Sequence, residues 1–131
     1  MKSARTTFTL AVFFLCHFSN FVQAAKPPEV EIVEMALHRK DGLIEVDTTV
    51  KNLSAKPILG LTAIYQFFAP GRTPITTQRT RIDRPTLAAG AEAVINAQLE
   101  APARAVTVEC SVVDLAGKEY RVKNAGPFAI E

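Results

Sequence analysis

Residues 106–112 read Val-Thr-Val-Glu-Cys-Ser-Val, and this stretch decides the fold. Apolar and polar side chains alternate along it without interruption. Successive residues of a β-strand point to opposite faces of a sheet, whereas a helix repeats about every 3.6 residues. The stretch therefore predicts a half-buried strand whose inner row holds Val106, Val108, Cys110 and Val112.

The same alternation recurs on both sides of this stretch, between turn signals. Asp41-Gly42 is typical of a tight hairpin turn and separates strands predicted at 30–39 and 44–51. A change of phase in the first strand indicates a bulge near Ile32 or a strand that switches sheets. Residues 58–68 are apolar on both faces and predict one continuous central strand, whereas residues 75–82 are polar and predict a solvated edge strand. Strands are also predicted at 93–99 and near 120–130. The pattern indicates an all-β, seven-stranded β-sandwich.

The first 24 residues predict a secretory signal peptide. Lys2 and Arg5 form a basic start, residues 8–15 a short apolar run, and Val22-Gln23-Ala24 a small-residue cleavage site. We expect residues 25–131 to form a single domain in the periplasm or outside the cell, with no membrane span after signal removal. The chain has 15 basic and 13 acidic residues, and removing Lys2 and Arg5 makes the two counts equal. A neutral domain gives no electrostatic reason to expect a nucleic-acid partner.

Several motifs resemble the bacterial FxLYD-type and related immunoglobulin-like domains of exported proteins. They are Val50-Lys51-Asn52-Leu53-Ser54, Lys56-Pro57-Ile58, the apolar strand ending in Tyr65, and Leu87-Ala88-Ala89-Gly90-Ala91-Glu92. The resemblance spans residues 30–128. It implies an immunoglobulin-like β-sandwich that serves as a non-enzymatic envelope module without a general ligand.

Cys110 and His38 are the residues with the strongest intrinsic chemistry. A nucleophilic thiolate needs a nearby cation, a helix N-terminus or a base, and the valines predicted around Cys110 supply none of these. We therefore interpret Cys110 as a packed core residue and His38 as a surface histidine beside the hairpin turn. Asn52-Leu53-Ser54 matches the glycosylation pattern, which we interpret as a turn. No catalytic, metal or cofactor motif is recognised, so we expect a protein that is not an enzyme.

Two groups of side chains are candidates for binding: Tyr65, Phe67 and Phe68, and the arginines Arg72, Arg79, Arg81 and Arg84. The aromatic residues exceed what one strand face can bury, which predicts a cleft or a docking patch at the end of the central strand. Arg79 and Arg81 would project from one face of the edge strand and could hold an anionic group. The alternative is that their charge only protects the edge from pairing. The candidate binding residues are Tyr65, Phe68, Arg79 and Arg81.

Three functional hypotheses follow from these patterns. The first is an exported, non-catalytic accessory module of the bacterial cell envelope that binds another envelope protein. The second is a small-ligand carrier or weak enzyme with a cleft near Tyr65, Phe67 and Phe68. The third is a homodimer formed by adding edge strands together, and the sequence leaves the oligomeric state open.

Overall fold

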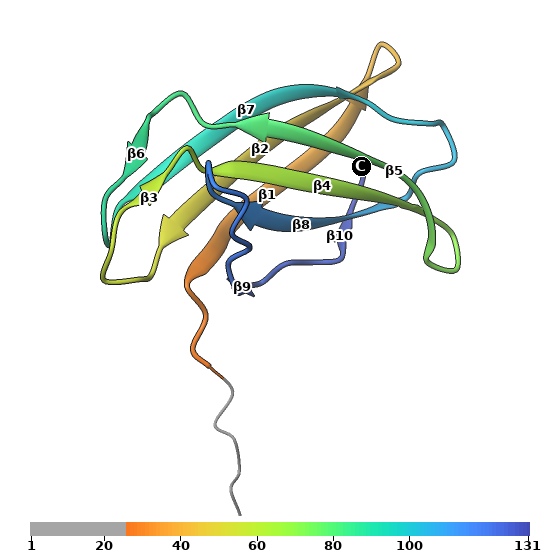
Figure 1. The fold of residues 1–131 in the computed structure, drawn as a ribbon. Coiled ribbons are helices and arrows are strands. Elements are labelled where there is room, and N and C mark those ends of the chain that lie inside the picture. Colours follow the sequence, from red (N-terminus) through yellow and green to blue (C-terminus); the bar gives the residue numbers. More distant parts are fainter. Residues whose placement is uncertain (1–25) are drawn as a thin grey trace, which may run out of the picture.

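The computed structural model describes residues 26–131, and this part of the chain is all-β, with ten strands and no helix (Figure 1). The predicted signal peptide and its cleavage site lie outside the described residues. Within residues 26–131, the structure has no helix that is long and apolar enough to cross a membrane. The strand content predicted from two-residue alternation is confirmed.

The strands form two four-stranded sheets and one short ribbon. The first sheet has the order β7-β2-β1-β9, the second sheet has the order β10-β8-β4-β5, and β3 pairs with β6 in the ribbon. The strands are β1 (Val30–Lys40), β2 (Leu43–Asn52), β3 (Ile58–Leu59), β4 (Thr62–Ala69), β5 (Thr73–Arg81), β6 (Thr86–Leu87), β7 (Glu92–Glu100), β8 (Thr107–Val113), β9 (Val122–Lys123) and β10 (Phe128–Ala129).

The hairpin between β1 and β2 forms where the sequence predicts it. Asp41 and Gly42 both have positive φ angles, of 51° and 78°, and they join the paired residues Lys40 and Leu43. Two-residue loops of this kind match the right-handed twist of the flanking strands. The bulge near Ile32 is also confirmed, because the register shifts between Ile32 and Glu34.

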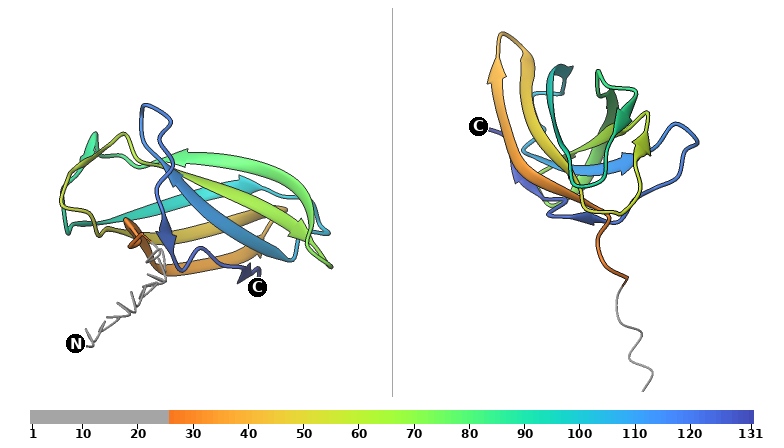
Figure 2. Two further views of the ribbon diagram at one scale, coloured as in Figure 1. Left: turned by 60° about the horizontal axis from the view of Figure 1, so that its bottom comes forward. Right: turned by 90° about the vertical axis from the view of Figure 1, so that its left-hand side faces the viewer.

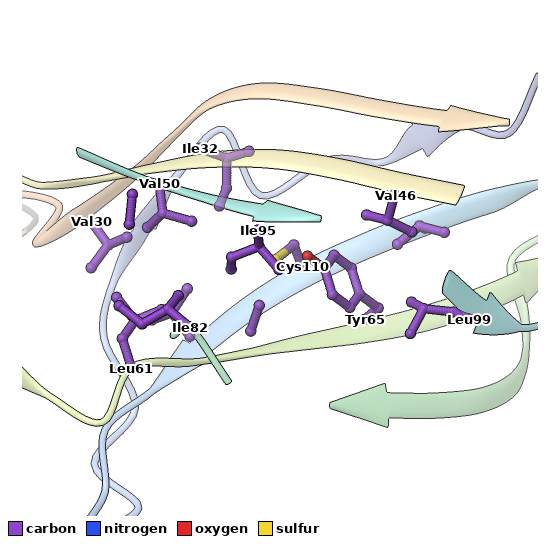
Figure 3. Packing of buried hydrophobic residues seen from close by; sticks show 14 of the residues in the cluster. Val30, Ile32, Val46, Val50, Leu61, Tyr65, Ile82, Ile95, Leu99 and Cys110 are labelled. Carbon is purple, nitrogen blue, oxygen red and sulfur yellow. The ribbon is translucent and has the colours of Figure 1, made fainter. Parts of the chain in front are cut away.

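The two sheets face each other across one hydrophobic core (Figure 3). Alternate residues of β2 and β7 point into it from the first sheet, and alternate residues of β4 and β8 from the second. Val108, Cys110 and Val112 are buried as predicted. Val106 differs from the expectation: it precedes the first residue of β8 and remains exposed.

The predicted continuous strand at 58–68 is divided at Gly60. This glycine has a φ of 59°, a conformation that breaks the strand, and its N–H bonds the carbonyl of Pro85 outside the sheet. β3 therefore leaves the second sheet and pairs with β6 in the ribbon. β4 keeps its predicted central place, between β5 and β8.

The end of the chain is divided between the two sheets. β9 pairs in parallel with β1, whereas β10 pairs in antiparallel with β8. The last predicted strand is thus two short ones. This division, the division at Gly60 and the additional two-residue strand β6 account for ten strands instead of seven. Figure 2 shows this closing segment on one side of the molecule, with β5 and β7 on the opposite side. The predicted edge position of β5 is confirmed.

Candidate functional site

Cys110 is a core residue of β8. Its side chain is buried and lies opposite Tyr65 of β4 in the sheet register. Burial raises the pKa of the Cys110 thiol to about 12. Because the thiol keeps its proton at neutral pH, it does not supply the thiolate that nucleophilic chemistry requires.

Tyr65 is also an interior residue, with no exposed surface. Its hydroxyl oxygen lies 2.7 Å from Oγ1 of Thr48, which belongs to the first sheet, so this hydrogen bond joins the two sheets through the core. Figure 3 shows the tyrosine ring between the layers, next to Cys110. Burial raises the pKa of Tyr65 well above its ordinary range. Phe67 packs in the same core, and Phe68 is buried outside the core cluster with Arg72 over its ring, so these three aromatic side chains do not line an exposed cleft.

Arg79 and Arg81 lie on the outer face of the second sheet. Tyr65 pairs with Gln78, whereas Arg79 pairs with Ile64, the next residue along β4. Neighbouring residues of a strand point to opposite faces, so Tyr65 and the arginines are on opposite sides of the sheet. The structure therefore does not bring the four predicted binding residues into one site.

The hydrogen bonds of Asn52 explain the Asn52-Leu53-Ser54 motif. The side chain has no exposed surface, and its amide nitrogen donates to the carbonyls of Lys56 and Leu87. Its oxygen accepts hydrogen bonds from the backbone N–H and the hydroxyl of Ser54. The motif thus forms a fully bonded turn, and the amide nitrogen is not accessible in the fold.

His38 is a surface residue, as the sequence indicates. Its Nε2 atom lies 2.6 Å from a carboxylate oxygen of Glu45, directly across the β1–β2 ladder. Both side chains are partly exposed, and exposed pairs of this kind contribute little to stability. Among residues 26–131, no group of three or more His, Cys, Asp or Glu side chains could hold a metal ion.

The loop that follows β8, at residues 114–120, is ordered by hydrogen bonds that the sequence does not predict. Asp114 accepts hydrogen bonds from the backbone N–H groups of Ala116 and Lys118, each at 2.9 Å, and from the Tyr120 hydroxyl at 3.0 Å. The bond from the Lys118 N–H lowers the pKa of Asp114, and partial burial together with the Asp114 bond raises the pKa of Tyr120 to about 12. Figure 2 shows this loop, in blue, protruding beside β3. These bonds to one carboxylate stabilise the conformation of the loop.

The loop presents Leu115 to solvent next to Leu59. Leu115 is 66% exposed and Leu59 is 56% exposed, and the Leu115 N–H donates to the Leu59 carbonyl at 2.9 Å. A hollow of about 440 Å³ lies here, and its lining is mostly apolar: Pro57, Leu59, Leu115, Ala116 and Tyr120, with Asp114. The isolated leucine in the turn sequence Asp-Leu-Ala-Gly at 114–117 was the available signal for it.

A second hollow, of about 380 Å³, adjoins the first and brings in Arg79 and Arg81. Asp114 and Leu115 line both hollows. The two arginines take part in no ion pair within residues 26–131. We call Leu59, Leu115, Arg79 and Arg81, with the two hollows between them, the Leu115 surface. It joins exposed apolar side chains to two unpaired positive charges.

Comparisons with known proteins assign no family. No family model matches the chain, and no curated protein sequence is similar to it. Among solved structures, the Pseudomonas fluorescens alkylpurine DNA glycosylase AlkC, bound to DNA with an abasic site analogue, gives a TM-score of 0.41 at 14% identity. That match covers 74% of this chain but 31% of the glycosylase. Northeast Structural Genomics Consortium target SoR45 gives a TM-score of 0.40 at 13% identity, covering 79% of this chain and 83% of the target. Likenesses at this level carry no conclusion about activity.

Proposed function

We propose that this chain is an exported, non-catalytic binding module of the bacterial cell envelope that docks another protein on the Leu115 surface. The basic and apolar pattern of the first 24 residues supports export to the periplasm or beyond. The two packed sheets support an immunoglobulin-like β-sandwich as its architecture. The observation that carries the proposal is the pair of exposed leucines beside two unpaired arginines.

The chemistry of the Leu115 surface fits protein docking. Single exposed apolar residues are common, but Leu59 and Leu115 border the same apolar hollow, with charged groups at its margin. Protein interfaces have apolar centres and are enriched in arginine. Because hydrogen bonds to Asp114 already order the loop, little conformational entropy remains to be lost when a partner binds.

The test is cross-linked capture from envelope extracts of the source cells, with wild-type protein and Leu115→Asp in parallel. Burying a leucine side chain stabilises a complex by about 1.5–3 kcal/mol, so the variant is expected to recover at least tenfold less partner. Val94→Asp is the matched control, because Val94 is 62% exposed on β7, outside the Leu115 surface. Equal capture by wild type and Leu115→Asp would refute docking at this surface. N-terminal sequencing of protein from fractionated cells tests export.

A small-ligand carrier is the second candidate, at a different place from the one the sequence suggests. The 440 Å³ hollow is large enough for a small apolar ligand, whereas Tyr65 and Phe67 are closed in the core. A thermal-shift screen of apolar metabolites distinguishes the two functions. A ligand at 100 times its Kd stabilises by about 2.7 kcal/mol, and Leu115→Asp would abolish that shift.

A further inference from the structure

The second sheet ends in a long free edge. β5 is the terminal strand of its sheet order, and the opposite end of that sheet is the two-residue strand β10. A free edge presents backbone donors and acceptors that another chain can pair with. Which backbone groups of β5 are free depends on the phase of the β4–β5 ladder, that is, on which residue pairs are hydrogen-bonded to each other.

One hydrogen bond fixes that phase. The N–H of Ile82 donates to the carbonyl of Leu61 at 3.1 Å, just beyond the paired residues Arg81 and Thr62. Hydrogen-bonded and non-hydrogen-bonded pairs alternate in an antiparallel ladder. The backbone groups of Thr80 and Gln78 therefore bond β4, whereas those of Thr77, Arg79 and Arg81 point away from it. The same three residues are exposed on the outer face of the sheet.

The side chains of this edge carry one sign of charge. β5 reads Thr-Pro-Ile-Thr-Thr-Gln-Arg-Thr-Arg, with no acidic residue. Arg79 and Arg81 have no ion-pair partner among residues 26–131. Pairing β5 with a second copy of itself would gather four arginines along one ladder, which like-charge repulsion disfavours. A strand with acidic residues opposite the arginines would be attracted instead.

The other long edge, β7, lacks this selectivity. The N–H of Asn52 donates to the carbonyl of Ala91, which by the same alternation leaves the backbone groups of every second residue from Glu92 to Glu100 free. The side chains between these two glutamates are neutral, and the glutamates themselves would repel an acidic strand. Charge complementarity therefore selects β5 and not β7.

We propose that β5 is a docking edge for an extended peptide segment in which acidic residues alternate with apolar ones. This inference deepens the proposed function, on which it rests, by naming the chemistry of the partner at Arg79 and Arg81. The acidic side chains would lie over the arginines on the outer face. The apolar side chains would point to the inner face, toward a hollow of about 510 Å³ between β5 and the end of β7. Its lining is Gly42, Leu43, Thr76, Gln78, Ala101 and Pro102, with Glu100.

The experiment uses a short, end-blocked peptide that alternates valine and glutamate, titrated into the purified protein at neutral pH. Hydrogen exchange measured by NMR shows which backbone amides of β5 are hydrogen-bonded and which are free. In the free protein, the amides of Thr77, Arg79 and Arg81 should exchange fast and those of Gln78 and Thr80 slowly. Bound peptide should slow the first group at least tenfold and leave the second unchanged. Every second amide of the bound peptide should face β5. N-methylation of the amides that face β5 should abolish binding, and N-methylation of the amides that face away should leave binding unchanged.

Variants separate strand addition from simple charge attraction. Thr77→Pro removes a free edge donor without touching the bonds to β4, and proline is tolerated at such positions, so binding should weaken at least tenfold. Thr77→Ala keeps the donor and should bind as the wild type does. Asn96→Pro makes the equivalent change on β7 and should also bind normally. If Thr77→Pro fails to fold, the peptide N-methylation contrast alone decides.

Three outcomes would overturn the inference. Binding that ignores N-methylation and Thr77→Pro would reduce β5 to a charged patch. Loss of binding in Asn96→Pro but not in Thr77→Pro would move the docking edge to β7. Absence of binding by any alternating peptide would leave the arginines as protection against pairing. None of these results touches capture by the Leu115 surface, since that test uses Leu115→Asp, so failure of the inference and failure of the proposed function are distinguishable.

Discussion

Replacing Asn52 by alanine should destabilise the fold more than replacing an exposed polar side chain by alanine. The Asn52 side chain makes four hydrogen bonds, to the Lys56 and Leu87 carbonyls and to the N–H and hydroxyl of Ser54. Each is worth about 0.5–1.5 kcal/mol, and the Leu87 carbonyl loses its Asn52 bond in a buried place. We expect a loss of about 3–4 kcal/mol in the free energy of unfolding, or roughly 15 °C in Tm.

The assay is urea unfolding followed by far-ultraviolet circular dichroism, because the chain has no tryptophan to report by fluorescence. Ser54→Ala is the matched control. It removes the hydroxyl bonds to Asn52 and Lys56 at a partly exposed position, where water replaces them, and it should cost about 1 kcal/mol or less. If Asn52→Ala lost no more stability than Ser54→Ala, the buried amide would not hold this turn and the reasoning would be refuted.

Three further predictions concern the core and the Leu115 loop. Burial raises the pKa of Cys110 from 9.0 to about 12, so between these pH values unfolding releases the thiol proton and the free energy of unfolding falls as pH rises. Between pH 8 and 10.5 the free energy of unfolding of the wild type should fall by about 2 kcal/mol more than that of Cys110→Ala, as measured by urea unfolding at each pH. Tyr65→Phe removes the hydrogen bond between the sheets and should cost about 1–2 kcal/mol, and adding Thr48→Val should recover part of it, whereas purely additive losses would show that the pair is not coupled. Gly60→Ala places a Cβ 2.9 Å from that of Leu115 at a positive φ and should cost about 1–2 kcal/mol. Adding Leu115→Gly should relieve the clash but not the backbone strain, and an unshifted Tm for Gly60→Ala would contradict the packing.

The parts of the fold that the sequence predicts are those set by local chemistry. The alternation in β2, β7 and β8 is read correctly because each has one buried and one solvated face. Asp41-Gly42 fixes its hairpin because both residues tolerate positive φ. The division at Gly60 is missed because an apolar run does not show where one sheet ends and another begins.

The aromatic cleft shows why the predicted site differs from the observed one. Phe67 and Phe68 are consecutive, so strict alternation would expose one of them. Phe67 packs in the core, whereas Phe68 lies outside the core cluster and is covered by Arg72, whose guanidinium carbon is 5.8 Å from the centre of the Phe68 ring. Tyr65 is buried because Thr48, which is distant in the sequence, lies across the core and bonds its hydroxyl. The spacing of the aromatic residues shows neither the Arg72 side chain over Phe68 nor the Thr48 partner of Tyr65.

Leu115 was missed for a related reason. A turn that ends in glycine suggests an ordinary polar loop. The local sequence does not show that Asp114 orders this loop or that Leu59 lies beside it. The Leu59 contact depends on the pairing of β3 with β6, which is itself a consequence of the division at Gly60. The exposed apolar pair is thus a product of topology.

The two interpretations of Arg79 and Arg81, protection and recruitment, rest on the same electrostatics. Positive charge on a free edge repels a second copy of β5, which is equally positive, and so keeps the edge from pairing with itself. The same charge lowers the energy of an acidic strand in that position, since opposite charges facing across a ladder are favourable. Protection and recruitment therefore differ only in the sign of the incoming side chains. An edge guarded by arginine, instead of being blocked by proline at Thr77, stays open to partners of the opposite charge.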